Sequence, residues 1–94
     1  MNTHTDKALK LIVAERHARQ MSYREFSECL GVHFQRVHQW ECGKRELSDA
    51  SILTLIKSEH QWVIDLAFRC LLIRYPVILQ LLAVRAGQVT PNRP

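Results

Sequence analysis

Nothing constrains the fold of this chain more than the stretch SYREFSECLGVHFQRVHQW. Glu25 follows Ser22 by three positions, and a serine and a glutamate at this spacing cap the first turn of a helix. The pattern predicts a helix over 23–30 that ends at Gly31, because glycine readily adopts the positive φ common after helix C-termini. A second helix is predicted over 34–41 after a connection of only three residues, so the two helices must cross tightly.

Apolar residues at helical spacing predict four further helices, and no segment shows the alternation typical of a strand. These helices are expected over 7–19, 49–58, 60–74 and 76–86. Asp6 is placed to cap the first of them, and Ser48 or Asp49 the second. Tyr75 separates the last two, because the residue before a proline avoids the helical region. The predicted fold is a compact all-α domain, divided into a helix-turn-helix region (1–58), two C-terminal helices (59–87) and a disordered tail (88–94).

The overall composition narrows the class of protein only slightly. A net charge of +4 over 94 residues is compatible with a polyanionic partner without requiring one. Three cysteines, an odd number, follow a polar start without the features of an export signal, which favours reduced thiols in a cytoplasm. No transmembrane helix is expected, because charged and polar residues interrupt the most apolar region, residues 62–84.

Two cysteine–histidine pairs raise the question of a metal site or a thiol nucleophile. Cys29 and His33, and then His38 and Cys42, are each four positions apart, a spacing that can bring two ligands together on a helix. The two pairs have opposite order, a turn separates them, and no C-x-x-C is present. No third group that would orient a cysteine–histidine couple is evident. We therefore expect no metal, no other cofactor and no enzymatic activity.

The two crossing helices and the run W-E-x-G-K-R that follows them resemble the helix-turn-helix domains of phage repressors, the lambda repressor and Cro-like family. The resemblance covers residues 7–58, about half of the chain, and is most specific over 31–45. It implies that one face of the helix over 34–41 enters the major groove of DNA. Two residues depart from the family. Ser27 replaces the usual alanine, which predicts slightly polar packing, and Leu47 replaces a common proline, which predicts a less fixed loop.

The resemblance implies three groups of site residues. Base edges would be contacted by His33, Phe34, Gln35, Arg36 and Gln39. Phosphates would be contacted by Ser22, Tyr23, Gly43, Lys44 and Arg45. A structural ion pair would join Arg16 to Glu41. The side-chain chemistry agrees, because glutamine pairs with adenine and arginine with guanine, while basic residues in an exposed turn reach phosphates.

The two C-terminal helices are apolar on nearly all sides. Such helices need burial on a second face, either in the core of one monomer or between two copies of the chain. A homodimer fits the resemblance, because repressors of this kind span two half-sites of DNA. The expected interface residues are Trp62, Leu66, Leu71, Val77, Leu79 and Leu82.

The resemblance therefore implies a cytoplasmic, homodimeric regulator of transcription that binds double-stranded DNA at an inverted repeat and represses by occupying a promoter. By analogy with other small autoregulators, it would come from a phage or a similar mobile element. Two alternatives stay open. An antitoxin would hold a protein partner through its C-terminal helices. An adaptor would keep the fold without binding DNA, and an exposed aromatic side chain at Phe34 would favour it.

Overall fold

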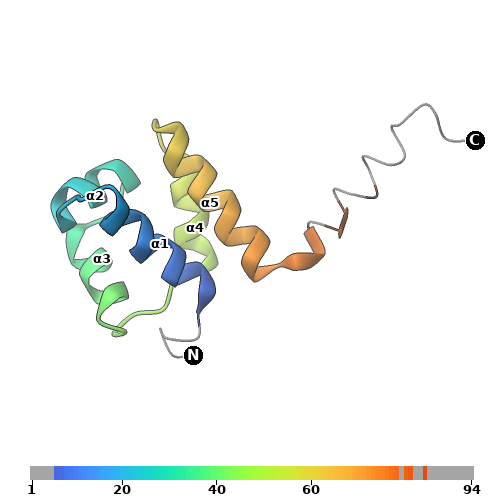
Figure 1. Ribbon diagram of the computed structural model, residues 1–94, viewed down its shortest axis with the longest axis horizontal. Coiled ribbons are helices and arrows are strands. Elements are labelled where there is room, and N and C mark those ends of the chain that lie inside the picture. Colours follow the sequence, from blue (N-terminus) through green and yellow to red (C-terminus); the bar gives the residue numbers. More distant parts are fainter. Residues whose placement is uncertain (1–5, 79, 82–83, 85–94) are drawn as a thin grey trace, which may run out of the picture.

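A computed structural model describes residues 6–78, 80, 81 and 84, which form helices and turns and contain no strand (Figure 1). The all-α expectation is confirmed for these residues. The helices are α1 (Lys7–Ala18), α2 (Tyr23–Leu30), α3 (Phe34–Glu41), α4 (Asp49–Ile56) and α5 (Gln61–Arg74). Residues 76–78, 80, 81 and 84 are also helical, in agreement with the sixth predicted helix. Residues 85–87 and the predicted tail 88–94 lie outside the described part of the chain.

Local capping determines where most of the helices begin. The Asp6 carboxylate accepts hydrogen bonds from the backbone N–H groups of Ala8 and Leu9, at 3.1 and 3.3 Å. Ser48, rather than Asp49, caps α4. These caps satisfy N–H groups that have no partner within the helix. The predicted ends differ from the structure by one or two residues, as is usual where helices terminate.

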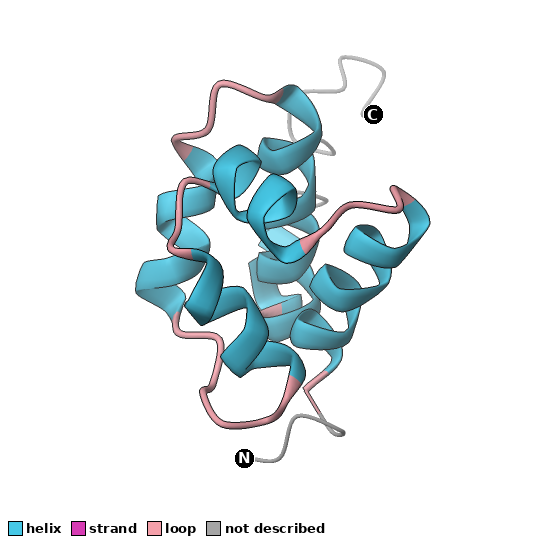
Figure 2. Cartoon of the chain, turned by 90° about the vertical axis from the view of Figure 1, so that its left-hand side faces the viewer, coloured by secondary structure: helices cyan, strands magenta, loops and turns pink. Residues whose placement is uncertain are grey.

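Helix α5 packs against both α1 and α4, and the loops that join the helices lie at the periphery (Figure 1, Figure 2). Its buried face consists of Val63, Leu66, Ala67 and Cys70, at the three- and four-residue spacing of one helical face. Helices α2 and α3 add Phe26, Val37 and Trp40 to the same hydrophobic cluster. Trp40 fills space there without a polar role, because its buried Nε1 has no hydrogen-bond partner among the described residues.

The expected dimer interface requires one correction. Leu66 is fully buried in the core of its own chain, so it presents no surface to a second copy. Trp62 is half-buried beneath Arg19, whose guanidinium lies 3.8 Å from the centre of its ring, and Leu71 is half-buried against the core. Val77 is exposed. Leu79 and Leu82 lie outside the described residues.

The loop between α3 and α4 is held more firmly than the sequence predicts. The Leu47 side chain is buried, and its carbonyl accepts a hydrogen bond from Arg74, at the end of α5. The same guanidinium donates to Asp6 Oδ2 at 2.8 Å and to Asp49 Oδ1 at 3.3 Å. Tyr75 adds a hydrogen bond to the other oxygen of Asp49. We call this cluster of five residues the Arg74 cluster. The expectation of a less fixed loop did not include these contacts, because it considered only the residue at position 47.

The Arg74 cluster should contribute measurably to stability. Replacing Arg74 with Met keeps much of the aliphatic packing but leaves Asp6, a largely buried carboxylate, without its partner. We expect the free energy of unfolding to fall by about 1–3 kcal/mol. The matched control is Arg69→Met on the same helix. Arg69 is exposed, and its contact with Glu15 is weak because 3.9 Å separates the two charged groups. This change should cost less than about 1 kcal/mol. Equal losses in urea unfolding would contradict the role of the cluster.

The hydrogen bond between Tyr75 and Asp49 predicts a particular pH dependence. It is the largest cause of a lowered Asp49 pKa, relative to the usual 3.8, and of a raised Tyr75 pKa, relative to the usual 10.0. Its stabilising effect is therefore present between these usual values. It is lost as the pH falls through the lowered pKa of Asp49 and as it rises through the raised pKa of Tyr75.

Thermal unfolding of the wild type and of Tyr75→Phe measures this dependence. The difference in stability between the wild type and Tyr75→Phe should be constant between about pH 5 and 9. It should become smaller below and above this pH range. A difference that is unchanged at pH values well below the usual pKa of Asp49 would show that this bond does not contribute.

Candidate nucleic-acid interface

Both ends of α2 are closed by the hydrogen bonds that its sequence predicts. The Ser22 hydroxyl accepts from the backbone N–H of Glu25 at 3.1 Å, and the Glu25 carboxylate accepts from the backbone N–H of Ser22 at 2.9 Å. Gly31 has a φ of 77° at the end of α2, and its N–H donates to the Ser27 carbonyl at 2.8 Å. The predicted capping box and glycine turn are both confirmed.

Ser27 is a polar residue in the core, and its hydroxyl has a hydrogen-bond partner there. Its side chain is buried, and its hydroxyl donates to the Arg24 carbonyl one turn earlier in α2, at 2.9 Å. A buried hydroxyl with a backbone acceptor avoids most of the cost of desolvation. The serine is therefore accommodated at this buried position.

Arg16 fixes the far end of α3 to α1. Its guanidinium donates to both carboxylate oxygens of Glu41, with a distance of 2.9 Å between Nη2 and Oε1. It also donates to the Met21 carbonyl at 2.8 Å and lies 4.3 Å from the centre of the Tyr23 ring. The hydrogen bond with Glu41 is the main cause of a raised Arg16 pKa. The predicted ion pair is confirmed, and it holds α3 at a defined angle to the rest of the chain.

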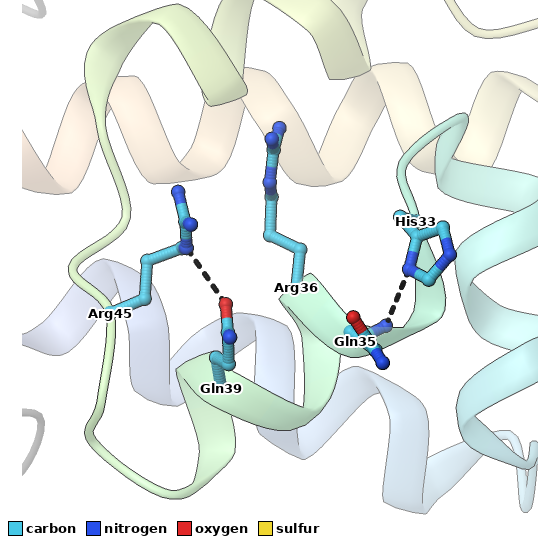
Figure 3. A pocket seen from close by; sticks show the side chains of 5 residues that line it. All are labelled: His33, Gln35, Arg36, Gln39 and Arg45. Carbon is cyan, nitrogen blue, oxygen red and sulfur yellow. Dashed lines mark hydrogen bonds between the residues drawn. The ribbon is translucent and has the colours of Figure 1, made fainter.

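A shallow hollow lies along the outward side of α3 (Figure 3). It is lined by His33, Gln35, Arg36, Gln39 and Arg45. His33 caps α3 by accepting a hydrogen bond from the backbone N–H of Gln35 at Nδ1, at 3.1 Å. The Arg45 Nε donates to Oε1 of Gln39 at 2.9 Å. Four of the five residues expected to contact bases therefore share one surface, and Arg45 joins them from the following loop.

Phe34 does not line this hollow. Its side chain is half-buried, its ring stacks on His33 with centroids 4.7 Å apart, and the Arg24 guanidinium lies 4.1 Å from its ring centre. These contacts give Phe34 a packing role at the start of α3. The sequence could not show this, because Arg24 and Phe34 lie on different helices.

The residues expected to contact phosphate fall into separate groups. Lys44 is exposed after Gly43, whose φ of 75° forms the turn. Arg45 is oriented into the hollow by Gln39 instead of lying beside Lys44. Ser22 is exposed at the start of α2, whereas Tyr23 is half-buried, with its ring edge-to-face with His38 at 5.1 Å. Of these residues, only Arg45 lines the hollow, and Ser22, Tyr23 and Lys44 lie outside it.

The two predicted cysteine–histidine pairs are not gathered into one cluster in the part of the chain that the structure describes. It holds no group of three or more His, Cys, Asp or Glu side chains that could bind a metal ion together. The exposed Cys42 lies 3.5 Å from Nε2 of His38, whereas Cys29 is partly buried against the core. Cys70 is buried and donates to the Ala8 carbonyl, and burial raises its pKa to about 11. At neutral pH this thiol is protonated and unreactive.

No protein-family model, no curated protein and no solved structure matches this chain. None of the described helices has the length and apolar character needed to cross a membrane.

The Arg16–Glu41 pair should be important for the stability of the interface. Glu41→Gln preserves the shape of the side chain but removes the charge that pairs with a guanidinium only 15% exposed. We expect a loss of about 1–3 kcal/mol in the free energy of unfolding. The control is Glu15→Gln, which disrupts the 2.6 Å pair with Arg19 within a single helix. A pair of that kind contributes about 0.3–0.5 kcal/mol. Denaturant titrations showing equal effects would refute the special role of Glu41.

Proposed function

We propose that this protein is a sequence-specific DNA-binding regulator of transcription that acts as a homodimer on an inverted repeat. In this proposal α2 and α3 form a helix-turn-helix, and the outward side of α3 enters the major groove. The observation that supports it is the hollow shared by His33, Gln35, Arg36, Gln39 and Arg45 (Figure 3). Repression then follows from occupying a promoter. The small size of the protein suits a phage or other mobile element by analogy alone.

The hollow presents the hydrogen-bonding groups that base edges require. A glutamine amide can donate to N7 and accept from N6 of adenine, and an arginine can donate twice to guanine. Arg45 occupies one lone pair of the Gln39 carbonyl oxygen and restricts the rotation of the amide. The second lone pair and the amide N–H groups stay available, so Gln39 can still read adenine. Gln35 is exposed, and only its backbone is engaged by His33.

Backbone contacts would come from the start of α2 and from the turn after α3. Lys44 projects from the exposed turn after α3, and Ser22 and Tyr23 begin α2. Phosphate contacts of this kind fix the register of a protein on DNA but carry no sequence information. They also make affinity depend on salt, because each neutralised phosphate releases counterions.

The adaptor alternative loses its main support. It depended on an exposed aromatic side chain at position 34, and Phe34 is half-buried between residues of α2 and the turn. Purification of the native protein distinguishes the antitoxin alternative from the proposed regulator, because a toxin would appear as a second protein in a fixed ratio.

The proposal predicts that base-reading and phosphate-binding residues respond differently to substitution. A selection from random duplexes first defines the preferred sequence, which should be an inverted repeat with half-site centres about one helical turn, or a small multiple of it, apart. Gln35→Ala should then weaken binding to that sequence by about 1–3 kcal/mol and leave scrambled DNA nearly unaffected. Lys44→Ala should weaken both DNAs and reduce the slope of log affinity against log salt by about one.

Lys57→Ala is the matched control for Lys44→Ala. Lys57 is also exposed, but it lies at the end of α4 and lines a different hollow with Glu28 and Glu59. Lys57→Ala should change neither the affinity for DNA nor the slope of log affinity against log salt. The proposed function is wrong if the selection enriches no sequence. The assignment of roles is wrong if Gln35→Ala weakens both DNAs equally or Lys44→Ala retains the full slope.

A further inference from the structure

Helix α5 carries a second apolar stripe in addition to its buried face. Ile64, Phe68 and Leu72 are spaced four residues apart and lie outside the hydrophobic core cluster. Phe68 is 50% exposed, whereas Ile64 and Leu72 are partly exposed. A stripe of this kind on a helix that already buries its other face is available for contact with another apolar surface.

The helical residues after Tyr75 carry a stripe of the same kind. Val77, Leu81 and Val84 are 54%, 64% and 58% exposed, at the four- and three-residue spacing of one helical face. We call the described residues of this segment, 76–78, 80, 81 and 84, the arm. At a rise of about 1.5 Å per residue, the arm stripe spans about 10 Å and the α5 stripe about 12 Å. The two stripes therefore match in length and in apolar character.

The Arg74 cluster fixes the direction in which the arm leaves α5. Arg74 binds Asp6, Asp49 and the Leu47 carbonyl, while Tyr75, with a φ of −127° and a ψ of 75°, interrupts the helix and bonds to Asp49. The arm consequently projects away from the bundle of α1 to α5 instead of folding back along α5 (Figure 1). The α5 stripe of the same chain is left uncovered by its own arm.

We infer that the homodimer forms by exchange of arms, with the Val77–Leu81–Val84 stripe of each protomer packing on the Ile64–Phe68–Leu72 stripe of its partner. This inference rests on the homodimer of the proposed function and specifies its interface. A second copy is the occupant because it supplies a matching stripe for each exposed one. A two-fold axis then makes two identical contacts and leaves no stripe exposed. Among the described arm residues no side chain is charged, so none has to be desolvated as an ion.

Complementary variants of the full chain test the exchange. Phe68→Lys damages the α5 stripe but leaves the arm intact, whereas Val77→Asp damages the arm but leaves the α5 stripe intact. In an exchanged dimer each variant alone carries two damaged contacts. A mixed dimer carries one native contact and one in which the damaged arm faces the damaged stripe. Each variant alone should therefore sediment as a monomer, and an equimolar mixture should recover the dimer.

Several results would overturn the exchange. A dimer of Val77→Asp alone would mean that α5 pairs with α5, and a dimer of Phe68→Lys alone would mean that arm pairs with arm. A mixture that stays monomeric, or a wild type that is monomeric at tens of micromolar, would also overturn it. Circular dichroism must show native helicity for both variants. Leu81→Asp, at a position 64% exposed, replaces Val77→Asp if that chain unfolds.

The arm exchange and the proposed function can fail independently of each other. Wild-type protein that selects an inverted repeat while the mixture stays monomeric would refute the exchanged arms and leave DNA recognition standing. Wild-type protein that dimerises through exchanged arms but prefers no DNA sequence would support the exchange and refute the regulator.

Discussion

Burial of one face of α5 is the interaction on which the other contacts depend. Val63, Leu66, Ala67 and Cys70 fill the space between α1 and α4, and Trp62 reaches Phe26 of α2 with ring centroids 5.9 Å apart. A fourteen-residue helix with apolar residues on several sides cannot place all of them in one small core. The same composition that completes the core therefore leaves a second stripe at the surface.

Two arginines convert this packed core into a defined arrangement of helices. Arg16 and Arg74 each bind a carboxylate from a distant part of the chain together with a backbone carbonyl. A guanidinium can do this because its donors point in several fixed directions, whereas a lysine ammonium is a single compact charge. Arg16 sets the position of α3, and Arg74 sets the position of the loop before α4 and the exit of the arm. The carboxylates of Glu41 and Asp6 are largely buried. Loss of either arginine would therefore leave a buried charge without its partner, which is strongly destabilising.

The sequence predicted those features that depend on neighbours along the chain. The capping box at Ser22, the glycine turn at Gly31 and the helix bounds within two residues all follow from local rules. The pair between Arg16 and Glu41 was predicted only through a resemblance. The Arg74 cluster and the stacking of Arg24 on Phe34 were missed, because they join residues whose proximity only the folded chain reveals. Leu66 was misassigned for a related reason, since apolar spacing cannot distinguish the buried side of a helix from an exposed apolar side.

The loop between α3 and α4 contacts both the polar hollow and the residues from which the arm departs. From its middle, Arg45 reaches back to Gln39 in the hollow. At its end, the Leu47 carbonyl and Asp49 are held by Arg74 and Tyr75, from which the arm departs. The loop spans only the few residues between Cys42 and Ser48, so these two sets of contacts lie close together along the chain. If the arm joins two protomers and the hollow reads DNA, this loop relates the spacing of the two recognition surfaces to the geometry of the dimer. Specificity for half-site spacing would then depend on Arg74, a residue that contacts neither DNA nor the partner.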